Sequence, residues 1–371
     1  MNLIATAAFG LEALVKEELV ELGFSDAKCL DNRVEFTAED YSKAVALSNI
    51  WLRCADRVLV MLGRFTATTY DDLFEQTKAL PWDEWITKDG KFTVTGKSVR
   101  SGLYSVPDVQ SIVKKAVVEK LKTKYKIEWF AETGAEYTIQ VSLLKDAATL
   151  TIDTTGQGSG LHKRGYRARA TKAPLKETMA AALIKLSRYN KSKAFYDPCC
   201  GSGTLPIEAA LMAKNIAPGL SRKFAAEKWN NMSKVAWKEA RKEAFANIRQ
   251  EVEPVIHAAD ISSDAIELAK QNAELAGVDD CIEFFTQPLS KTVLPSDRGI
   301  AIVNPPYGER LGEVKQAEEL YGELSKIFNP TKWNVYVLTP DEFFETAYKK
   351  KARAKRKLFN GMIKTDYYQY F

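Results

Sequence analysis

The sequence predicts an α/β protein whose C-terminal part is a mostly parallel sheet ending in an antiparallel hairpin, preceded by two smaller α+β regions. From residue 194 onward, apolar strand-like runs alternate with helical patterns, which is typical of a parallel sheet covered by helices on both faces. Near the C-terminus, Asn360-Gly361 separates two β-rich runs and indicates a hairpin. Before residue 160 the strands and helices are shorter and closely punctuated by turn residues.

The first region, residues 1–65, has the order strand–helix–strand–strand–helix–strand. Apolar residues at helical spacing predict helices over 11–22 and 41–54, and β-rich runs predict strands over 33–36 and 57–64. This order is typical of a ferredoxin-like domain.

The second region, residues 66–158, opens with a helix that ends near Pro81. It continues with strands over 91–97, 137–143 and 148–153 and with a lysine-rich helix over 108–125. A basic linker and a leading helix, residues 159–190, then connect it to the last domain, residues 191–371. Strands are expected there at 194–198, 255–259, 281–285, 299–303 and 333–338, with a charged helical insertion over about 223–249.

Composition excludes several classes of protein. The 371 residues include 46% hydrophobic and 27% charged residues, as in ordinary soluble proteins. No apolar run approaches the roughly 20 residues that span a bilayer, and the N-terminus has no secretory pattern. Five cysteines without a CxxC pair, and only two histidines, argue against a metal site. We therefore expect a cytoplasmic protein with no membrane partner and no metal; its oligomeric state stays open.

The first chemical motif is AFYDPCCGSGTLPIEAA, residues 194–210, in which a strand ends at Asp197 and a glycine turn leads into a helix. Gly201 and Gly203 allow a sharp turn and a close approach to a ligand. A nicotinamide pocket fits poorly, because Pro206 replaces the third glycine of its fingerprint. The acidic residue before the glycines suits a positively charged ligand such as S-adenosylmethionine (SAM). The alternative is a strand–helix turn without special function.

The second motif, residues 255–277, is a strand ending at Asp260 followed by a helix capped by Ser262 or Ser263. A carboxylate at this position can accept both hydroxyls of a ribose. The alternative is an aspartate that merely caps the helix.

The third and most specific motif is Asn304-Pro305-Pro306-Tyr307, directly after an apolar strand. The prolines fix the backbone and remove two N–H donors, so that carbonyl oxygens are left as acceptors. The Asn304 side-chain oxygen and the Pro305 carbonyl can each accept one hydrogen of a planar amino group, and can stabilise the positive charge that grows on its nitrogen during methyl transfer. Tyr307 offers a ring face for stacking a base. A proline-rich turn is the alternative.

Other reactive side chains have simpler interpretations. His257 lies in a predicted strand and is expected to be structural, whereas His162 lies in the basic linker and is expected to contact RNA and not to act in catalysis. Cys199 and Cys200 have no neighbouring histidine and are expected to serve as small side chains in a tight turn.

Two basic segments are candidates for contact with RNA phosphates. One is the linker, with a tyrosine among its cations; its candidate residues are Lys163, Arg164, Tyr166, Arg167, Arg169 and Lys172. The other is KKKARAKRK, residues 349–357. The net charge of +5 permits a nucleic-acid partner without requiring one.

These motifs, together with GLHKRGYRARATKAPLKETMAA and the closing LFNGMIKTDYYQY, resemble the class I methyltransferases that carry a THUMP domain. The resemblance is closest to the N-terminal half of the bacterial 23S rRNA guanine-N2 methyltransferases. It implies a ferredoxin-like domain, an RNA-binding THUMP domain and a Rossmann-like catalytic domain that uses SAM to form N2-methylguanine in 23S rRNA. Some family members carry a second methyltransferase half, before which this chain ends.

Carried onto this sequence, the resemblance gives a catalytic motif, Asn304, Pro305, Pro306 and Tyr307. The candidate cofactor contacts are Asp197, Cys199, Gly201, Gly203, Thr204, Asp260, Ile261, Gln287 and Asn304. One departure concerns the adenine contact, where the family usually has an acidic residue and this chain has Gln287.

Several other functions use the same amine-binding logic. A DNA adenine-N6 methyltransferase, a tRNA guanine-N2 methyltransferase and a protein glutamine methyltransferase all remain open, as does a non-catalytic RNA-binding factor. The domain order before residue 160 favours RNA over DNA, and the basic segments have no use in protein methylation.

Overall fold

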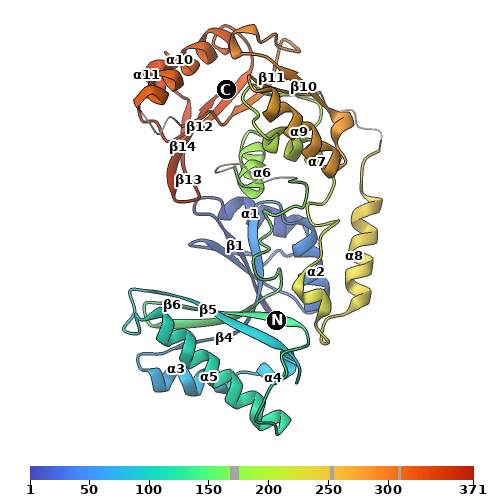
Figure 1. Ribbon diagram of the computed structural model, residues 1–371, viewed down its shortest axis with the longest axis vertical. Coiled ribbons are helices and arrows are strands. Elements are labelled where there is room, and N and C mark those ends of the chain that lie inside the picture. The colour runs from blue at the N-terminus through green and yellow to red at the C-terminus, as the bar shows by residue number, and fades with distance from the viewer. Residues whose placement is uncertain (168–174, 251–254, 308–310) are drawn as a thin grey trace. The chain divides into compact units, whose positions relative to one another are not determined.

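The computed structural model describes residues 1–167, 175–250, 255–307 and 311–371, without the side chains of 311–314, and the chain forms two compact units (Figure 1). Unit 1 comprises residues 1–7, 15–161 and 222–243, and unit 2 comprises residues 8–14, 162–221 and 244–371. Residues 8–14 thus belong to unit 2 although their neighbours in the sequence belong to unit 1, and residues 222–243 belong to unit 1 although their neighbours belong to unit 2.

The beginning of unit 1 has the ferredoxin-like order that the sequence predicts. Its elements are β1 (Asn2–Ala7), α1 (Glu12–Glu21), β2 (Lys28–Leu30), β3 (Arg33–Thr37), α2 (Tyr41–Trp51) and β4 (Ala55–Thr66). Asp40 caps α2 by accepting a hydrogen bond from the Lys43 N–H at 3.0 Å.

The following elements of unit 1 match the second predicted region. They are α3 (Tyr70–Ala79), α4 (Trp82–Trp85), β5 (Lys91–Val99), α5 (Val106–Tyr125), β6 (Glu136–Leu144) and β7 (Ala147–Asp153). A capping box formed by Thr69 and Asp72 fixes the start of α3. Side chains alternate along β6, where Ile139, Val141 and Leu143 are buried. Helices α3 and α5 lie side by side along one face of these strands (Figure 1).

The two predicted N-terminal regions share one sheet. Its strand order is β2-β3-β1-β4-β7-β6-β5. Strand β4 joins the halves, because it pairs with β1 along residues 55–61 and with β7 along residues 59–66. The predicted boundary at residue 65 therefore falls within a strand that pairs on both of its edges.

The charged insertion of the sequence lies largely in unit 1. It contains a 3₁₀ turn, η1 (Ala225–Lys228), and the helix α8 (Lys234–Ala246), whose last residues belong to unit 2. Trp229 anchors it: the indole is 1% exposed, stacks on Tyr137 with ring centroids 5.0 Å apart, and donates a hydrogen bond to the Glu136 carbonyl. Aromatic burial of this kind attaches the insertion firmly to unit 1.

Unit 2 contains a mixed sheet of order β10-β9-β8-β11-β12-β14-β13. Its parallel strands are β8 (Ala194–Asp197), β9 (Ile256–Asp260), β10 (Ile282–Thr286), β11 (Gly299–Val303) and β12 (Asn334–Thr339). Its helices and turns are α6 (Glu177–Leu186), α7 (Thr204–Ala213), α9 (Ser263–Ala276), η2 (Asp279–Cys281), η3 (Leu289–Lys291), α10 (Leu311–Phe328) and α11 (Phe344–Ala347). No described helix has the length and apolar character needed to cross a bilayer.

The C-terminal hairpin forms as predicted, but its turn is shifted by one residue. Strand β13 (Ala354–Asn360) pairs with β14 (Ile363–Tyr370), and Asn360 lies opposite Ile363. The turn residues are therefore Gly361, with a φ of 66°, and Met362. Asn360 is a strand residue and is not needed for the left-handed turn.

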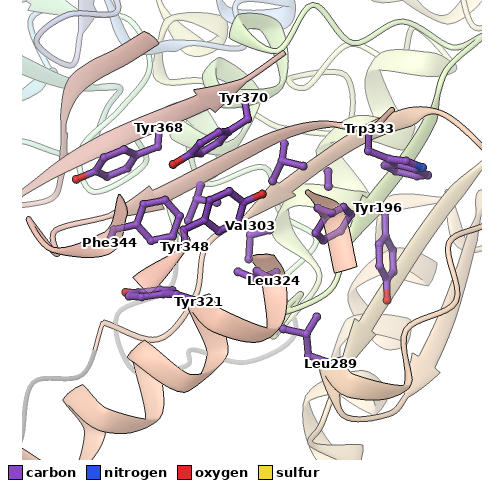
Figure 2. Close-up of a cluster of buried hydrophobic side chains, with 14 of the residues drawn as sticks. Tyr196, Leu289, Val303, Tyr321, Leu324, Trp333, Phe344, Tyr348, Tyr368 and Tyr370 are labelled. Atoms are coloured by element: carbon purple, nitrogen blue, oxygen red, sulfur yellow. The ribbon is translucent and has the colours of Figure 1, made fainter. Parts of the chain in front are cut away.

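A buried aromatic cluster fixes the strand ends of unit 2 (Figure 2). Helix α10 contributes Tyr321, Leu324 and Phe328, and β14 contributes Tyr368 and Tyr370. The sheet contributes Tyr196, Ala259 and Val303, which are the residues directly before Asp197, Asp260 and Asn304. Because neighbouring strand residues point to opposite faces, burial of the first three constrains where the following three lie.

Candidate active site

Three polar residues meet at one edge of the sheet of unit 2. Asp197, Asp260 and Asn304 lie at the carboxyl ends of the adjacent strands β8, β9 and β11. Asp197 pairs with Ala258, and Tyr196 with Ala301, so Asp260 and Asn304 each lie two positions beyond Asp197 on the strands that flank it. In open α/β sheets, ligands bind at this edge.

The turn after β8 has the geometry that its glycines permit. Gly201 and Gly203 have φ values of 51° and 83°. A Cβ on Gly203 would meet the Cβ of Ala269 at 3.0 Å, whereas a Cβ on Gly201 would meet nothing within 4 Å. Gly203 thus allows α7 and α9 to pack closely, and Gly201 leaves its backbone open to a ligand. The buried Asn272 amide donates to the Ser202 carbonyl and holds the turn.

Asp260 organises the same turn. Its Oδ2 accepts a hydrogen bond from the Gly201 N–H at 3.0 Å, and its Oδ1 accepts one from the Ser262 N–H at 2.9 Å. Ser262 caps α9 by accepting from the Ala265 N–H, as predicted. Each carboxylate oxygen of Asp260 keeps a further lone pair, which is what a ribose diol requires.

Asp197 is almost completely buried, with 1% of its surface exposed. Its Oδ1 accepts one hydrogen bond, from the Cys199 N–H. Burial raises the pKa of the Asp197 carboxyl well above its usual range, and the nearby Asp260 charge adds to this rise, while the Cys199 hydrogen bond opposes it. A cationic group beside Asp197 would stabilise the charged form of the carboxylate, so this buried carboxylate fits the ammonium group of SAM.

The remaining cofactor candidates come after the carboxyl ends of β8, β9 and β10. Ile261, next to Asp260, is 75% exposed and offers an apolar surface to a flat ring. Gln287, directly after β10, donates its backbone N–H to the Asp260 carbonyl. Burial raises the pKa of the Cys199 and Cys200 thiols well above their usual range, so both stay protonated. Thr204 begins α7, and its hydroxyl accepts from Arg167 at 3.1 Å.

The acceptor motif, Asn304-Pro305-Pro306-Tyr307, follows β11 directly. Asn304 and Tyr307 are half-buried, Pro305 is buried and Pro306 is exposed. The Tyr307 hydroxyl donates to the Asn304 Oδ1 at 2.8 Å, and the Asn360 side-chain amide donates to the Tyr307 hydroxyl at 3.2 Å. Sequence reasoning missed Asn360, because the Asn-Gly pair was interpreted as turn chemistry alone.

The described part of the linker before α6 packs within unit 2. Arg164 is 4% exposed and forms an ion pair with Glu208, which also accepts from the Tyr166 hydroxyl at 3.1 Å. Arg167 binds Glu177 and the Leu175 carbonyl, both at 2.6 Å. These three side chains therefore have structural partners inside unit 2, whereas Lys163 is exposed. Arg169 and Lys172 lie outside the described residues.

The second basic segment is partly engaged with β14. Lys350 and Arg353 lie over the rings of Tyr370 and Phe371. Lys355 donates to the Tyr368 hydroxyl at 3.0 Å and pairs with Asp366 at 3.3 Å. Lys351 and Lys357 are exposed and retain the character of phosphate-binding candidates.

Three domain families match the chain in the order of its elements. A ferredoxin-like domain named for RlmL matches residues 2–59, a THUMP domain matches residues 67–153, and an RMKL-like methyltransferase domain matches residues 164–369. The last family spans more than half of the chain.

Two curated relatives extend this finding. The chain is 48% identical over its whole length to YpsC of Bacillus subtilis, provisionally named as an RNA methyltransferase, and covers 96% of it. It is 35% identical over 96% of its length to the ribosomal RNA large subunit methyltransferase K/L of Psychromonas ingrahamii, and covers 48% of that protein. The chain thus spans about half the length of the K/L relatives it matches.

Two solved structures share the whole fold. One, from Listeria monocytogenes, is described as a predicted N6-adenine-specific DNA methylase; it is 48% identical, with a TM-score of 0.94, over 100% of this chain and 96% of the other. The second, SMU.472, is provisionally named as a methyltransferase and was solved with SAH, the form that SAM takes after giving up its methyl group. It is 41% identical, with a TM-score of 0.93, over 100% of this chain and 97% of the other.

Proposed function

The chain belongs to the SAM-dependent RNA methyltransferases that combine ferredoxin-like, THUMP and RMKL-like methyltransferase domains, and on this premise we propose that it methylates the exocyclic N2 amine of a guanine in 23S rRNA. The observation that carries the proposal is the position of Asn304-Pro305-Pro306-Tyr307 beside Asp197 and Asp260 at one sheet edge. Acceptors for an amine thus adjoin carboxylates suited to SAM.

In the proposed site, Asp197 binds the ammonium group of SAM and Asp260 the ribose hydroxyls. Gly201 lets the cofactor approach the backbone, and Ile261 and Gln287 border the adenine. The bound cofactor supplies an electrophilic methyl group on its sulfonium. These residues orient that methyl group, and positioning of the two reactants provides much of the acceleration.

Asn304 and Pro305 hold the target amine. Each of their oxygens accepts one N–H hydrogen, which aims the nitrogen lone pair at the methyl group. The same oxygens stabilise the positive charge that develops on the nitrogen, and this charge disappears when one N–H proton leaves to solvent after the transfer. The target guanine has to leave its stack to reach this edge, and Tyr307 offers a stacking face for it.

The K/L relatives favour rRNA as the substrate, and the THUMP domain favours RNA in general. The alternative, adenine-N6 methylation of DNA, is the activity given for the Listeria neighbour. Amine chemistry does not separate the two, but the N-terminal domain order is that of an RNA enzyme. A tRNA guanine-N2 methyltransferase is the remaining alternative within RNA.

Mass spectrometry of nucleosides from a strain that lacks the gene tests the proposal. We expect N2-methylguanosine to fall in 23S rRNA, to remain in tRNA, and to return when the purified enzyme and SAM are added to the deficient RNA. Loss of N2-methylguanosine from tRNA alone would support the tRNA alternative. Loss of N6-methyladenine from DNA, with rRNA unchanged, would refute the proposal.

A further inference from the structure

The acceptor motif and the C-terminal hairpin are joined by a chain of two hydrogen bonds. The Asn360 Nδ2 donates to the Tyr307 hydroxyl at 3.2 Å, and the Tyr307 hydroxyl donates to the Asn304 Oδ1 at 2.8 Å. Asn304 and Asn360 are 56 positions apart in the sequence, on strand ends that belong to different parts of the same sheet. All three side chains are half-buried, where hydrogen bonds are stronger than in open water.

The direction of these bonds has a chemical consequence. An amide N–H can only donate, so Asn360 occupies a lone pair of the Tyr307 oxygen and leaves its hydrogen to point at Asn304. A hydroxyl that donates must meet the carbonyl oxygen of Asn304 and not its NH₂ group. The Asn304 carboxamide is thereby held in one of its two flip states, with a second lone pair of Oδ1 left for a substrate amine.

Burial supports the donor role of Tyr307. It raises the pKa of the Tyr307 phenol, while the Asn360 hydrogen bond acts in the opposite direction. The phenol therefore keeps its proton at neutral pH, where it can donate to Asn304.

Contacts along β13 hold Asn360 in place. The turn itself uses Gly361 and Met362, so the Asn360 side chain is not needed there and is available to Tyr307. The ring of Phe359, the residue before Asn360, packs edge-on against Phe9 with ring centroids 6.2 Å apart. On the same strand, Arg356 donates a hydrogen bond to the Gly10 carbonyl at 2.6 Å. Segment 8–14, which belongs to unit 2, thus holds the strand that carries Asn360.

We propose that Asn360 is a positioning residue for methyl transfer, which orients the Asn304 oxygen toward the substrate amine by fixing the hydrogen of Tyr307. It does not touch the reacting atoms. This inference rests on the proposed function, because it assigns to Asn360 a part in presenting the amine acceptor.

A double-mutant cycle in the full-length chain tests this relay, by which we mean the two hydrogen bonds from Asn360 through Tyr307 to Asn304. The substrates are SAM and rRNA from a strain that lacks the gene. We expect N360A and Y307F each to lower kcat on the order of 100-fold, the scale at which a misplaced catalytic group slows a reaction, with little change in the Kd of SAM. We expect N360A to add almost nothing in the Y307F background, because the hydroxyl it orients is already gone.

N360D and M362A sharpen the comparison. A carboxylate at position 360 has nearly the same shape but accepts the Tyr307 hydrogen, so N360D is expected to lose at least as much kcat as N360A. Met362 is 99% exposed at the tip of the same hairpin, so M362A is the matched control and is expected to keep kcat. Thermal unfolding of every variant reports whether the hairpin itself has been damaged.

A substrate-free measurement separates this inference from the proposed function. In ¹⁵N spectra, the side-chain amide signals of Asn304 are expected to broaden or shift in N360A and Y307F and to stay in place in M362A. The inference would be overturned by any of three results: kcat losses of N360A and Y307F that add up in the double variant, an N360D enzyme with wild-type kcat, or Asn304 signals that do not move. A wild-type enzyme that transfers no methyl group to any rRNA would instead refute the proposed function, and the spectra would still test the relay.

Discussion

Asn304 is the residue on which the proposed chemistry depends most directly. Replacing it with alanine removes one amine acceptor and leaves Asp197 and Asp260 intact. We expect N304A to bind SAM with nearly unchanged affinity and to lose methyl transfer by about 100- to 1,000-fold, as when one electrostatic contact to a transition state is removed. Calorimetry with SAM and single-turnover transfer to rRNA measure the two effects. Near-normal turnover in N304A would contradict the role assigned to Asn304.

Asp197 combines the charge that we propose binds SAM with a cost to stability. Folding raises the pKa of this buried carboxyl, so the stability it contributes is fully present below the ordinary aspartate pKa and is lost as the pH rises through the raised value. The D197N substitution puts an uncharged carboxamide in the place of this carboxyl. We therefore expect unliganded D197N to melt at a higher temperature than the wild type at neutral pH, and the difference to shrink as the pH falls.

The same substitution should weaken SAM binding by about 10- to 100-fold, because it removes the proposed charge-assisted contact with the ammonium group. Binding of the cation favours deprotonated Asp197, so wild-type affinity is expected to fall as the pH decreases, and that of D197N to depend less on pH. Thermal melts and calorimetry across pH measure both properties. A D197N protein that is less stable yet binds SAM normally would contradict this account.

At the scale of residues, the sequence predicted the polar residues at the ends of strands or directly after them. It missed Asn360, which reaches Asn304 through Tyr307. Asp197, Asp260 and Asn304 each follow an apolar run, and the adjacency of their strands brings them to one edge. Asn360 gave a misleading signal, because asparagine before glycine is common in turns. Its contact with Tyr307 depends on tertiary packing, which local patterns do not encode.

At the scale of elements, the basic linker contains cations in different environments. Arg164 is buried against Glu208, which is 0% exposed, whereas the neighbouring Lys163 is exposed. We expect R164A to destabilise the protein by about 3–5 kcal/mol, because it leaves a buried carboxylate without its charge partner. We expect K163A to change stability by less than about 0.5 kcal/mol, and to reduce the salt slope of RNA binding by about one.

Denaturant unfolding and RNA titrations at several salt concentrations distinguish the two substitutions. Lys326, an exposed lysine near the end of α10, provides a charge-matched control whose loss should leave RNA affinity unchanged. If R164A were fully stable and bound RNA weakly, Arg164 would be a phosphate contact as the sequence suggested. A salt slope that K163A leaves unchanged would remove Lys163 from the RNA-binding surface.

The periodicity of the sequence located most strands and helices to within two or three residues. Strand β11 (Gly299–Val303) occupies the predicted range, β8 is one residue shorter than predicted, and β9 and β10 are each shifted by one residue toward the C-terminus. Periodicity did not reveal that β4 pairs with both β1 and β7, because one alternating pattern serves a strand whatever lies on its edges. Nor did it place Trp229, since its partners Glu136 and Tyr137 are distant in the sequence.

At the scale of the whole molecule, each unit is completed by a segment from another part of the chain. Residues 8–14 belong to unit 2, where Phe9 and Gly10 contact the hairpin strand β13. Residues 222–243 belong to unit 1, where Trp229 is buried against Tyr137. The domains recognised in the sequence are therefore not independent as cut pieces of chain, even though each family model matches one continuous range.

This exchange predicts the behaviour of a truncated chain that begins at residue 159. It lacks Phe9 and Gly10, so the strand that carries Asn360 loses two contacts, and it exposes Trp229 and other apolar residues of 222–243, at about 1.5–3 kcal/mol for each large side chain. We expect the truncated chain to aggregate or to lose near-ultraviolet dichroism. Replacing residues 222–243 with a short glycine–serine loop should restore solubility. It should not restore the wild-type melting temperature, because the support from residues 8–14 is still missing. Dichroism, thermal melts and SAM calorimetry measure these properties, and a truncated chain that matches the full-length protein in all three would show that both exchanged segments are dispensable.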